Sequence, residues 1–438
     1  MRQAESRRTI PKNHFMRIVR HTDKDFAKSL ASFQRRAIPA PAVEDTVREI
    51  ISAVRSRGDA ALLEYHAKFG GPTLAAKQLR ETRKPCVDAA TQEAIATAHA
   101  NVSAFAQRSL RKGWTAKNAQ GATVGERFDP FQRVGIYVPG GTAPLVSTAV
   151  MTVTFAAAAG VPEIVVATPS DASGRVNDAL LYALHQAGAT EIYKVGGAQA
   201  IAALAYGTKT IAPVAKIFGP GNSYVVEAKR QAFGAVSIDL LPGPSEILVL
   251  ADATANPAWI AADLLAQAEH GKGSQILFVT NSAKLLTAVN VEIKLQCATL
   301  SRQEHLADVI DKYCTLVQVK SLKDGIAIAN DFAPEHIAIV AKDDEKIAEQ
   351  IRTSGAIFLG PYSAVVAGDF LAGPSHTLPT GGAGKSFPGL TAEMFQRRTS
   401  IVRFDEKSLR KSLPTIAKFS EIEGLDAHGR SAAIRLGM

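Results

Sequence analysis

Gln267 and His270 lie three residues apart in the stretch AADLLAQAEHG, residues 261–271. The stretch is rich in Ala and Leu and closes on Gly271, so it predicts the end of a helix. Side chains three apart share one face of a helix, so an amide oxygen and an imidazole there could converge on a metal ion such as zinc. The alternative is a helix that ends at an exposed polar edge, and spacing alone does not exclude it.

A second pair of reactive side chains, Glu335 and His336, follows Pro334 and opens the apolar stretch HIAIV. Proline fixes its own φ and restrains the residue before it, so we expect a defined loop here. An adjacent carboxyl and imidazole could transfer protons in two different steps of one reaction. A surface loop that carries two polar residues is the alternative.

Further candidates lie toward the C-terminus. Asp369 and His376 fall in a segment rich in Gly and Pro, which is typical of loops that carry site residues, although Asp after Gly is also simple turn chemistry. Glu423 and His428 are five residues apart. In one continuous helix they would face different parts of the surface, so a shared site would need a bend. Taken alone, His428 is expected to face solvent.

Residues 134–252 contain the elements that would position a ligand. The expected buried strands are VGIYV, EIVVAT, TEIYKV and ILVLAD, and the glycine turns beside strands and helices are PGGTAP, GGAQ, GPGN and PGPSE. This alternation predicts βαβ units in an open parallel sheet. Such sheets bind phosphorylated or dinucleotide ligands at strand ends, where backbone N–H groups and helix N-termini are presented. No turn matches the GxGxxG fingerprint.

The remaining patterns complete an α/β fold. Helices are expected within residues 30–70 and 87–110, and a polar helix near the C-terminus. We therefore expect two doubly wound, incomplete Rossmann-like domains with small helical segments at both ends. The expected boundaries are an N-terminal arm at 1–29, a discontinuous domain at 30–136 with 246–389 that carries the reactive residues, a nucleotide-side domain at 137–245, and a dimer-swapped helical tail at 390–438.

Composition limits the classes of function. Of 438 residues, 46% are hydrophobic and 21% charged, which is ordinary for a globular protein. The net charge of +9 is concentrated in residues 1–40, which hold ten basic and three acidic side chains. The rest is close to neutral, which argues against a nucleic-acid groove. The basic start is compatible with a flexible arm, a subunit contact or a transit-like segment without a secretory core. We favour an arm that packs on a partner subunit.

Cys86, Cys297 and Cys314 show no CxxC spacing. This argues against a disulfide framework and against a cysteine-ligated zinc, and it fits a reducing compartment such as the cytoplasm. The longest apolar stretch, residues 145–167, is interrupted by Thr, Gly, Pro and Glu, so no membrane span is expected.

Together these motifs resemble the histidinol dehydrogenase family, from about residue 30 to the end. The matching motifs follow in order: YVPGGTAP, GGAQAIAALAYGT, GPGNSYVVEAKR, GPSEILV, DLLAQAEHG, APEH, GDFLAGPSHTLPTGG, RRTS and EGLDAH. The resemblance implies an enzyme that oxidises L-histidinol through L-histidinaldehyde to L-histidine with two NAD, the last steps of histidine biosynthesis. It also implies one zinc per site and a homodimer whose subunits share their sites.

The resemblance assigns roles to individual residues. It implies a zinc held by Gln267, His270, Asp369 and His428, the last donated by the partner subunit, and an acid/base pair formed by Glu335 and His336. The implied substrate contacts are Ser245, Gln267, His270, His336, Asp369, His376, Glu423 and His428. The implied NAD contacts are Tyr137, Gln199 and Asn222.

Some residues depart from the commonest family pattern: Leu241-Pro242 before GPSE, Ser375 before His376, and Lys385. They lie beside the expected substrate pocket and leave the metal and proton-transfer groups intact. A related zinc and NAD dehydrogenase of another small alcohol, such as sulfopropanediol, therefore stays an alternative. A non-catalytic nucleotide- or metal-binding protein on the same scaffold is a third possibility, against which the intact reactive set argues.

Overall fold

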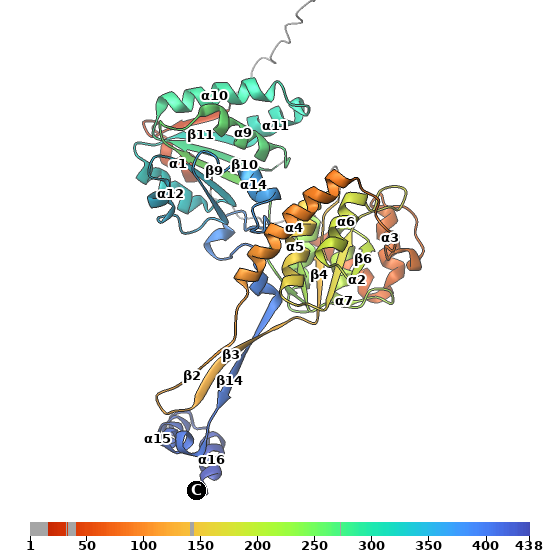
Figure 1. Cartoon of the computed structure of the whole chain (residues 1–438), viewed down its shortest axis with the longest axis vertical. Helices are drawn as coiled ribbons and strands as arrows, with labels where there is room; N and C mark the ends of the chain where they lie inside the picture. Colours follow the sequence, from red (N-terminus) through yellow and green to blue (C-terminus); the bar gives the residue numbers. More distant parts are fainter. Residues whose placement is uncertain (1–15, 32, 34–40, 141–143, 272) are drawn as a thin grey trace, which may run out of the picture.

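The computed structural model describes residues 16–31, 33, 41–140, 144–271 and 273–438. Figure 1 shows two α/β lobes and a long ribbon that carries the C-terminal helices away from both. One lobe holds a six-stranded parallel sheet in the order β1-β11-β10-β9-β12-β13, and the other a five-stranded parallel sheet in the order β6-β5-β4-β7-β8. The predicted fold class, α/β with two doubly wound, incomplete Rossmann-like units, is confirmed.

The chain enters the five-stranded sheet at its central strand, β4. Its strands are β4 (Arg133–Tyr137), β5 (Glu163–Thr168), β6 (Glu191–Lys194), β7 (Lys216–Phe218) and β8 (Ser237–Ile238). The chain moves outward from β4 to β5 and β6, then crosses to β7 and β8 on the other side of β4. The order of strands therefore reverses between β4 and β7, which is the position where open parallel sheets form a ligand crevice at their carboxyl edge.

Helices cover both faces of this sheet. One face is covered by α4 (Ala89–Ser109), α5 (Val146–Ala158) and α6 (Asp178–Ala187). The other is covered by α2 (Pro41–Arg57), α3 (Asp59–Lys68), α7 (Gly197–Tyr206) and α8 (Ser223–Ala232). Each helix buries an apolar stripe, as with Ile95 and Val102 on α4 and Val47 and Ile50 on α2.

This packing differs from the domain boundaries that we expected. Residues 41–109 were grouped with 246–389, yet their helices bury their apolar faces on the five-stranded sheet. Strand β4, from residue 133, also belongs to that sheet, whereas we began the domain at 137. The physical reason is that the sequence of an amphipathic helix shows that one of its faces must be buried, but not which of the two sheets buries it.

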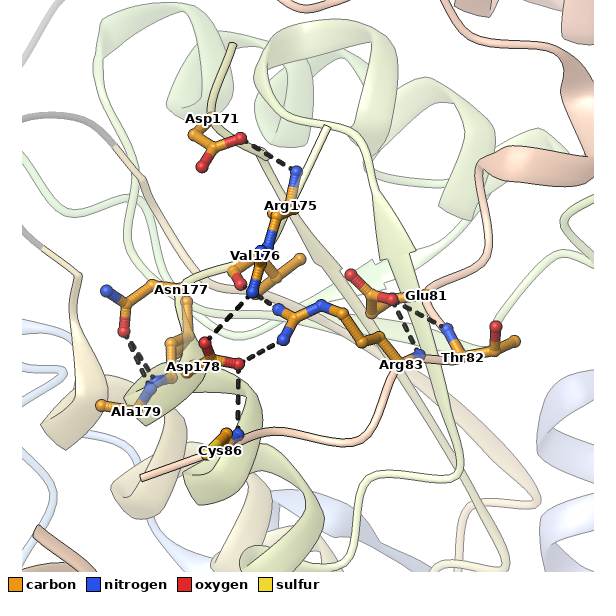
Figure 2. A network of polar contacts seen from close by, with 11 residues as sticks. Glu81, Thr82, Arg83, Cys86, Asp171, Arg175, Val176, Asn177, Asp178 and Ala179 are labelled. Atoms are coloured by element: carbon orange, nitrogen blue, oxygen red, sulfur yellow. Dashed lines mark hydrogen bonds and ion pairs between the residues drawn. The ribbon is translucent and has the colours of Figure 1, made fainter. Parts of the chain in front are cut away.

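An arginine network fixes the segment between α3 and α4 to this lobe (Figure 2). Arg83 donates to the Asp178 carboxylate and, at 2.6 Å, to the carbonyl oxygen of Val176. The backbone N–H of Cys86 donates to the same carboxylate. Hydrogen bonds from Arg83 help to hold the pKa of Asp178 below its ordinary value. The segment is thus tied to the first turn of α6, which brings α4 onto this lobe.

The six-stranded sheet has the same plan. It consists of β1 (Arg17–Arg20), β9 (Glu246–Ala251), β10 (Gln275–Thr280), β11 (Cys314–Gln318), β12 (His336–Val340) and β13 (Ala356–Leu359). One face packs against α9 (Pro257–Ala268), α10 (Ala283–Cys297), α11 (Gln303–Tyr313) and α14 (Val365–Phe370). The other packs against α1 (Phe26–Ala31), α12 (Leu322–Phe332) and α13 (Asp344–Ala348). Here the strand order reverses between β9 and β12.

Part of the expected N-terminal arm, residues 17–29, belongs to this lobe. Strand β1 pairs in parallel with β11 at the sheet edge, and α1 packs beneath it. Val19 is buried, so the apolar side chains of the segment find a place in the core despite its basic charge. The expectation for residues 1–15 lies outside the described residues.

The ribbon is a three-stranded antiparallel sheet in the order β14-β3-β2, formed by β2 (Trp114–Lys117), β3 (Thr123–Pro130) and β14 (Gln396–Arg403). It leads to α15 (Glu406–Glu423) and α16 (Asp426–Ala433) at its far end (Figure 1). The tail is therefore two helices, where we expected one. Gly424, with φ of 66°, ends α15 and produces the bend between Glu423 and His428.

Short 3-10 helices complete the described elements: η1 (Ala76–Gln78), η2 (Ala383–Lys385), η3 (Ala392–Phe395) and η4 (Ile434–Leu436). All three cysteines are free, with Cys86 exposed and the other two buried. Within the part of the chain that the structure describes, no helix combines the length and apolar character that a bilayer crossing requires.

Candidate active site

The reactive side chains gather at the amino-terminal edge of the six-stranded sheet. Glu246 opens β9, His336 opens β12, and the two strands are adjacent. Helix α9 runs back across the sheet, so its end, at Gln267 and Ala268, also lies at this edge before the chain enters β10. Open parallel sheets usually bind ligands at the opposite, carboxyl edge. The usual preference for the carboxyl edge therefore does not predict the position of this site.

The surroundings of His336 favour one tautomer of its neutral ring. Its side chain is buried, and Nδ1 lies 3.1 Å from the carbonyl oxygen of Glu246. A carbonyl oxygen only accepts, so Nδ1 carries the proton in the neutral ring and Nε2 keeps its lone pair. Nε2 lies 3.6 Å from Oδ1 of Asp369. Burial lowers the pKa of His336, which favours this neutral form. The ring is thus arranged to accept a proton at Nε2.

Glu335 is buried beside it. Its Oε2 accepts hydrogen bonds from the Ser245 hydroxyl and, at 2.8 Å, from the backbone N–H of Glu246. Burial raises the pKa of Glu335 to about 8, although these two hydrogen bonds act in the opposite direction. The carboxyl therefore holds a proton at neutral pH and releases it under mildly alkaline conditions.

Asp369 on α14 is joined to the other lobe through His376. His376 Nδ1 donates to the carbonyl oxygen of Asp369 at 3.0 Å. The other ring nitrogen, Nε2, lies 2.9 Å from the hydroxyl of Thr148 on α5. With its proton on Nδ1, the neutral ring accepts from that hydroxyl. Burial lowers the pKa of His376. This chain of contacts connects the five-stranded lobe to the backbone of Asp369.

Gln267 lies in the last turn of α9, as the sequence predicted, whereas His270 lies in the turn that follows the end of the helix at Ala268. Gln267 is buried, and among the described residues its Nε2 has no hydrogen-bond partner. His270 follows about one turn later and is exposed. The surrounding chain partly desolvates its imidazole and lowers the pKa, whereas the nearby Asp369 raises it and His336 lowers it further. His270, His336 and Asp369 therefore share one electrostatic environment.

Glu423 and His428 do not join this group. They lie on α15 and α16 at the far end of the ribbon (Figure 1). Among residues 16–438 outside the masked gaps, no three His, Cys, Asp or Glu side chains are grouped to hold a metal. The buried amide of Gln267, together with His270 and Asp369, still offers the N and O donors that zinc takes. Of the four implied zinc ligands, Gln267, His270 and Asp369 therefore belong to this lobe, and His428 lies on the tail.

The three residues implied in NAD contact lie at the carboxyl edge of the five-stranded sheet. Tyr137 ends β4, and its hydroxyl accepts from the N–H of Gly197 at 3.1 Å. Gln199, in the first turn of α7, is buried, and within the described chain its Oε1 has no hydrogen-bond partner. Asn222 caps α8 by accepting from the N–H groups of Tyr224 and Val225. These positions surround the point where the strand order reverses, which suits a dinucleotide.

Two residues that the sequence did not single out support the site. Glu246 accepts from the N–H of Gly381 at 2.9 Å, and its own backbone holds Glu335 and His336. A charged residue at the start of an otherwise apolar buried strand was the available signal. The second residue is Thr148, which contacts His376. No local sequence pattern distinguished it from the other threonines of α5.

The departures from the commonest pattern differ in their surroundings. Ser375 is buried, and its hydroxyl accepts from the N–H of Thr377 at 3.2 Å. Lys385 forms an ion pair with Asp331 at 3.1 Å, with both side chains exposed. Leu241 and Pro242 precede Gly243, whose N–H donates to the hydroxyl of Thr380.

A family model described as "Histidinol dehydrogenase" matches residues 33–436. The chain belongs to the histidinol dehydrogenase family. It is 41% identical over 428 residues to the histidinol dehydrogenase of Syntrophotalea carbinolica, with 96% of this chain and 99% of that protein covered. It is 43% identical to that of Agrobacterium fabrum, covering 94% and 97%. The crystal structure of histidinol dehydrogenase from Elizabethkingia anophelis matches with a TM-score of 0.92 at 34% identity, covering 97% and 98%.

Membership of this family confirms the resemblance drawn from the motifs, and with it the predicted class of NAD-dependent oxidoreductase of histidine biosynthesis.

Proposed function

We propose that this protein oxidises L-histidinol to L-histidine through L-histidinaldehyde and reduces two NAD. The observation that carries the proposal is the buried pair of Glu335 and His336, in which one group is poised as a base and the other exchanges its proton near pH 8. A two-step oxidation needs two such groups, because an alcohol proton must be removed and a water must then be added. Membership of the family supports the same substrate.

His336 is the group that we assign to the alcohol proton. The Glu246 carbonyl keeps the ring proton on Nδ1, so Nε2 is free to accept the hydroxyl proton. As that proton leaves, the carbon transfers its hydride to the nicotinamide and becomes an aldehyde. In the second oxidation the hydrate loses a proton and a hydride in the same way, with His336 assisting again.

Glu335 is the group that we assign to water addition. Ser245 and the N–H of Glu246 both bond to Oε2, which fixes the carboxyl and leaves Oε1 as the oxygen assigned to the water. In its ionised form it accepts a proton as the water adds to the aldehyde carbon. A site covered by a second subunit would exclude bulk water from the aldehyde between the steps.

We infer that zinc is held by Gln267, His270 and Asp369 of one chain and by His428 of a second copy. Zinc would supply a Lewis-acidic centre that orients the substrate. Support comes from the mixed N and O donors, to which the buried side chain of Gln267 would contribute its amide oxygen. Substrate contacts by Ser245, His376 and Glu423 belong to the same proposal, as do NAD contacts by Tyr137, Gln199 and Asn222.

The proposed homodimer rests on the tail. Phe419, Ile422 and Ile434 on the tail helices are exposed by 59%, 68% and 60%. A two-helix unit at the end of a ribbon has no core of its own, so a second copy would bury these side chains. The same unit carries Glu423 and His428, which one chain holds far from the site. Both observations support sites that are shared between two subunits. The free cysteines fit a reducing compartment, and we propose the cytoplasm.

The test is the yield of NADH per L-histidinol with added zinc, with histidine assayed as the product. Two NADH per substrate, lost on chelation and restored by zinc, is the expected result. Folded, zinc-loaded protein that forms no NADH from histidinol but oxidises sulfopropanediol would move the substrate to that alcohol. Stoichiometric zinc without turnover of any alcohol would favour a binding protein.

A further inference from the structure

A fully buried ion pair, Lys229 with Asp239, lies in the five-stranded lobe. Both side chains are 0% exposed. Lys229 belongs to α8, and Asp239 directly follows β8. Desolvation of two charges offsets most of their attraction, so a buried ion pair is weak evidence for added stability. The proton-transfer and metal-binding roles described above do not use this pair, and its purpose has to be sought in its contacts.

Both charges of this pair meet at one residue, Gly219. The N–H of Gly219 donates to Oδ2 of Asp239 at 2.8 Å, and Nζ of Lys229 donates to the carbonyl oxygen of Gly219 at 2.9 Å. Asp239 Oδ1 accepts from Lys229 and from the N–H of Leu240. The pair therefore holds both backbone polar groups of Gly219. Hydrogen bonds to charged groups are about twice as strong as those between neutral groups.

Gly219 opens the GPGN turn at the carboxyl end of β7. Its φ is +109°, and a Cβ at this position would lie 2.1 Å from the carbonyl oxygen of Tyr137. The turn is thus packed against the end of β4, at the point where the strand order reverses, in a conformation that other residues rarely adopt. Three residues later Asn222 caps α8. The backbone of the crevice wall depends on the position of this turn.

We propose that Lys229 and Asp239 are positioning residues for the dinucleotide, which fix the turn of residues 219–222 before the cofactor binds. The inference rests on the proposed use of this lobe for NAD. Binding to a preformed turn avoids the entropy that ordering the turn would otherwise require. The pair thereby contributes to affinity for the cofactor without touching it, and it has no part in holding the alcohol or the metal.

The double variant Lys229→Met with Asp239→Leu tests this role, because it removes both charges and leaves no lone buried charge. The NAD dissociation constant is measured by calorimetry, together with KM for NAD, KM for histidinol, kcat at saturating NAD, zinc content and the midpoint of thermal unfolding. We expect the dissociation constant and KM for NAD to rise roughly ten- to a hundredfold, the range for loss of hydrogen bonds to charged groups. KM for histidinol and zinc content should stay at wild-type values.

Arg133→Met is the matched control. Arg133 forms an ion pair with Glu191 at 2.7 Å on the same sheet, but at the amino edge, away from the turn. This variant should unfold at a lower temperature and bind NAD as the wild type does. If the double variant does not fold, Lys229→Gln with Asp239→Asn replaces it. It keeps polar side chains at both positions without a lone buried charge, so NAD binding should weaken by a smaller factor.

Folded Lys229/Asp239 variants that bind NAD like the wild type would overturn the inference and leave the proposed function intact. Equal weakening of NAD binding in Arg133→Met would also overturn it, because the effect would then be general softening of the lobe. Wild-type protein that binds no NAD would overturn the proposed function and this inference together.

Discussion

Glu335→Gln should stabilise the metal-free protein at neutral pH while it impairs the second oxidation. Burial raises the pKa of Glu335 to about 8 in the folded chain, against 4.5 for the ordinary carboxyl. Between these values the folded chain holds a proton that the unfolded chain has released, so the free energy of unfolding falls as pH rises. Glutamine cannot ionise, and its amide oxygen can still accept from Ser245 and the N–H of Glu246.

The size of the effect follows from the pKa difference. The unfolded carboxyl at pH 7 is about 2.5 pH units above its own pKa, and each unit corresponds to about 1.4 kcal/mol. Ionisation in the unfolded state therefore lowers the stability of the wild type by about 3 kcal/mol at pH 7. The variant lacks this penalty. Its advantage in free energy of unfolding should be near zero at pH 4.5, the ordinary pKa, and should level off above pH 8.

The assay is urea unfolding of chelator-treated wild type and variant at several pH values across this interval. Glu349→Gln, which changes an exposed carboxylate at the end of α13 in the same lobe, is the control and should give a small difference. A difference between Glu335→Gln and the wild type that stays constant across the interval would refute the argument from burial. With zinc and NAD present, the variant should release about one NADH per histidinol, because it lacks the group assigned to water addition.

Three further outcomes are expected. His336→Asn can keep a donor toward the Glu246 carbonyl but offers no basic nitrogen, so kcat should fall by roughly two to four orders of magnitude at unchanged zinc content; retained turnover would remove this residue from the mechanism. Thr148→Val breaks the hydrogen bond between the lobes and should lower kcat several-fold. Thr154→Val is the control and should leave kcat unchanged, because Thr154 lies on the same helix and its buried hydroxyl has no hydrogen-bond partner among the described residues. Equal losses of kcat in both variants would indicate a packing effect. A mixture of His428→Ala and Glu335→Gln chains should regain activity as heterodimers form, and activity that equals the sum of the separate variants would exclude shared sites.

Several parts of the fold and site followed from the sequence because they depend on local chemistry. Buried parallel strands require apolar stretches, and their turns require glycine, so the βαβ units were visible from residue 134 onward. The end of α9 at Gln267 and Ala268 followed from helix formers and a closing Gly271. Glu335 and His336 were fixed as a pair by adjacency. The motifs in order then sufficed to predict the family, which the comparisons confirmed.

The tail illustrates what local patterns leave open. A single polar helix was expected near the C-terminus, and Gly424 instead ends α15 with a positive φ. The long ribbon that carries this tail away from the lobes was not predicted, because antiparallel pairing joins β3 with the distant β14. The pairing of strands far apart in sequence depends on the whole fold, and a short stretch of sequence carries little information about it.

The sequence by itself predicted the candidate reactive residues, the βαβ units of the nucleotide-side lobe and the family of the chain, because these depend on residue types at short spacing. Only the tertiary structure decided that α2, α3 and α4 cover the five-stranded sheet, that the reactive groups meet at the amino edge of the six-stranded sheet, and that Thr148 reaches His376 across the lobes. It also decided where His336 carries its proton and that the pKa of Glu335 lies near 8. These properties arise from burial and from contacts between distant segments, which exist only once the chain has folded.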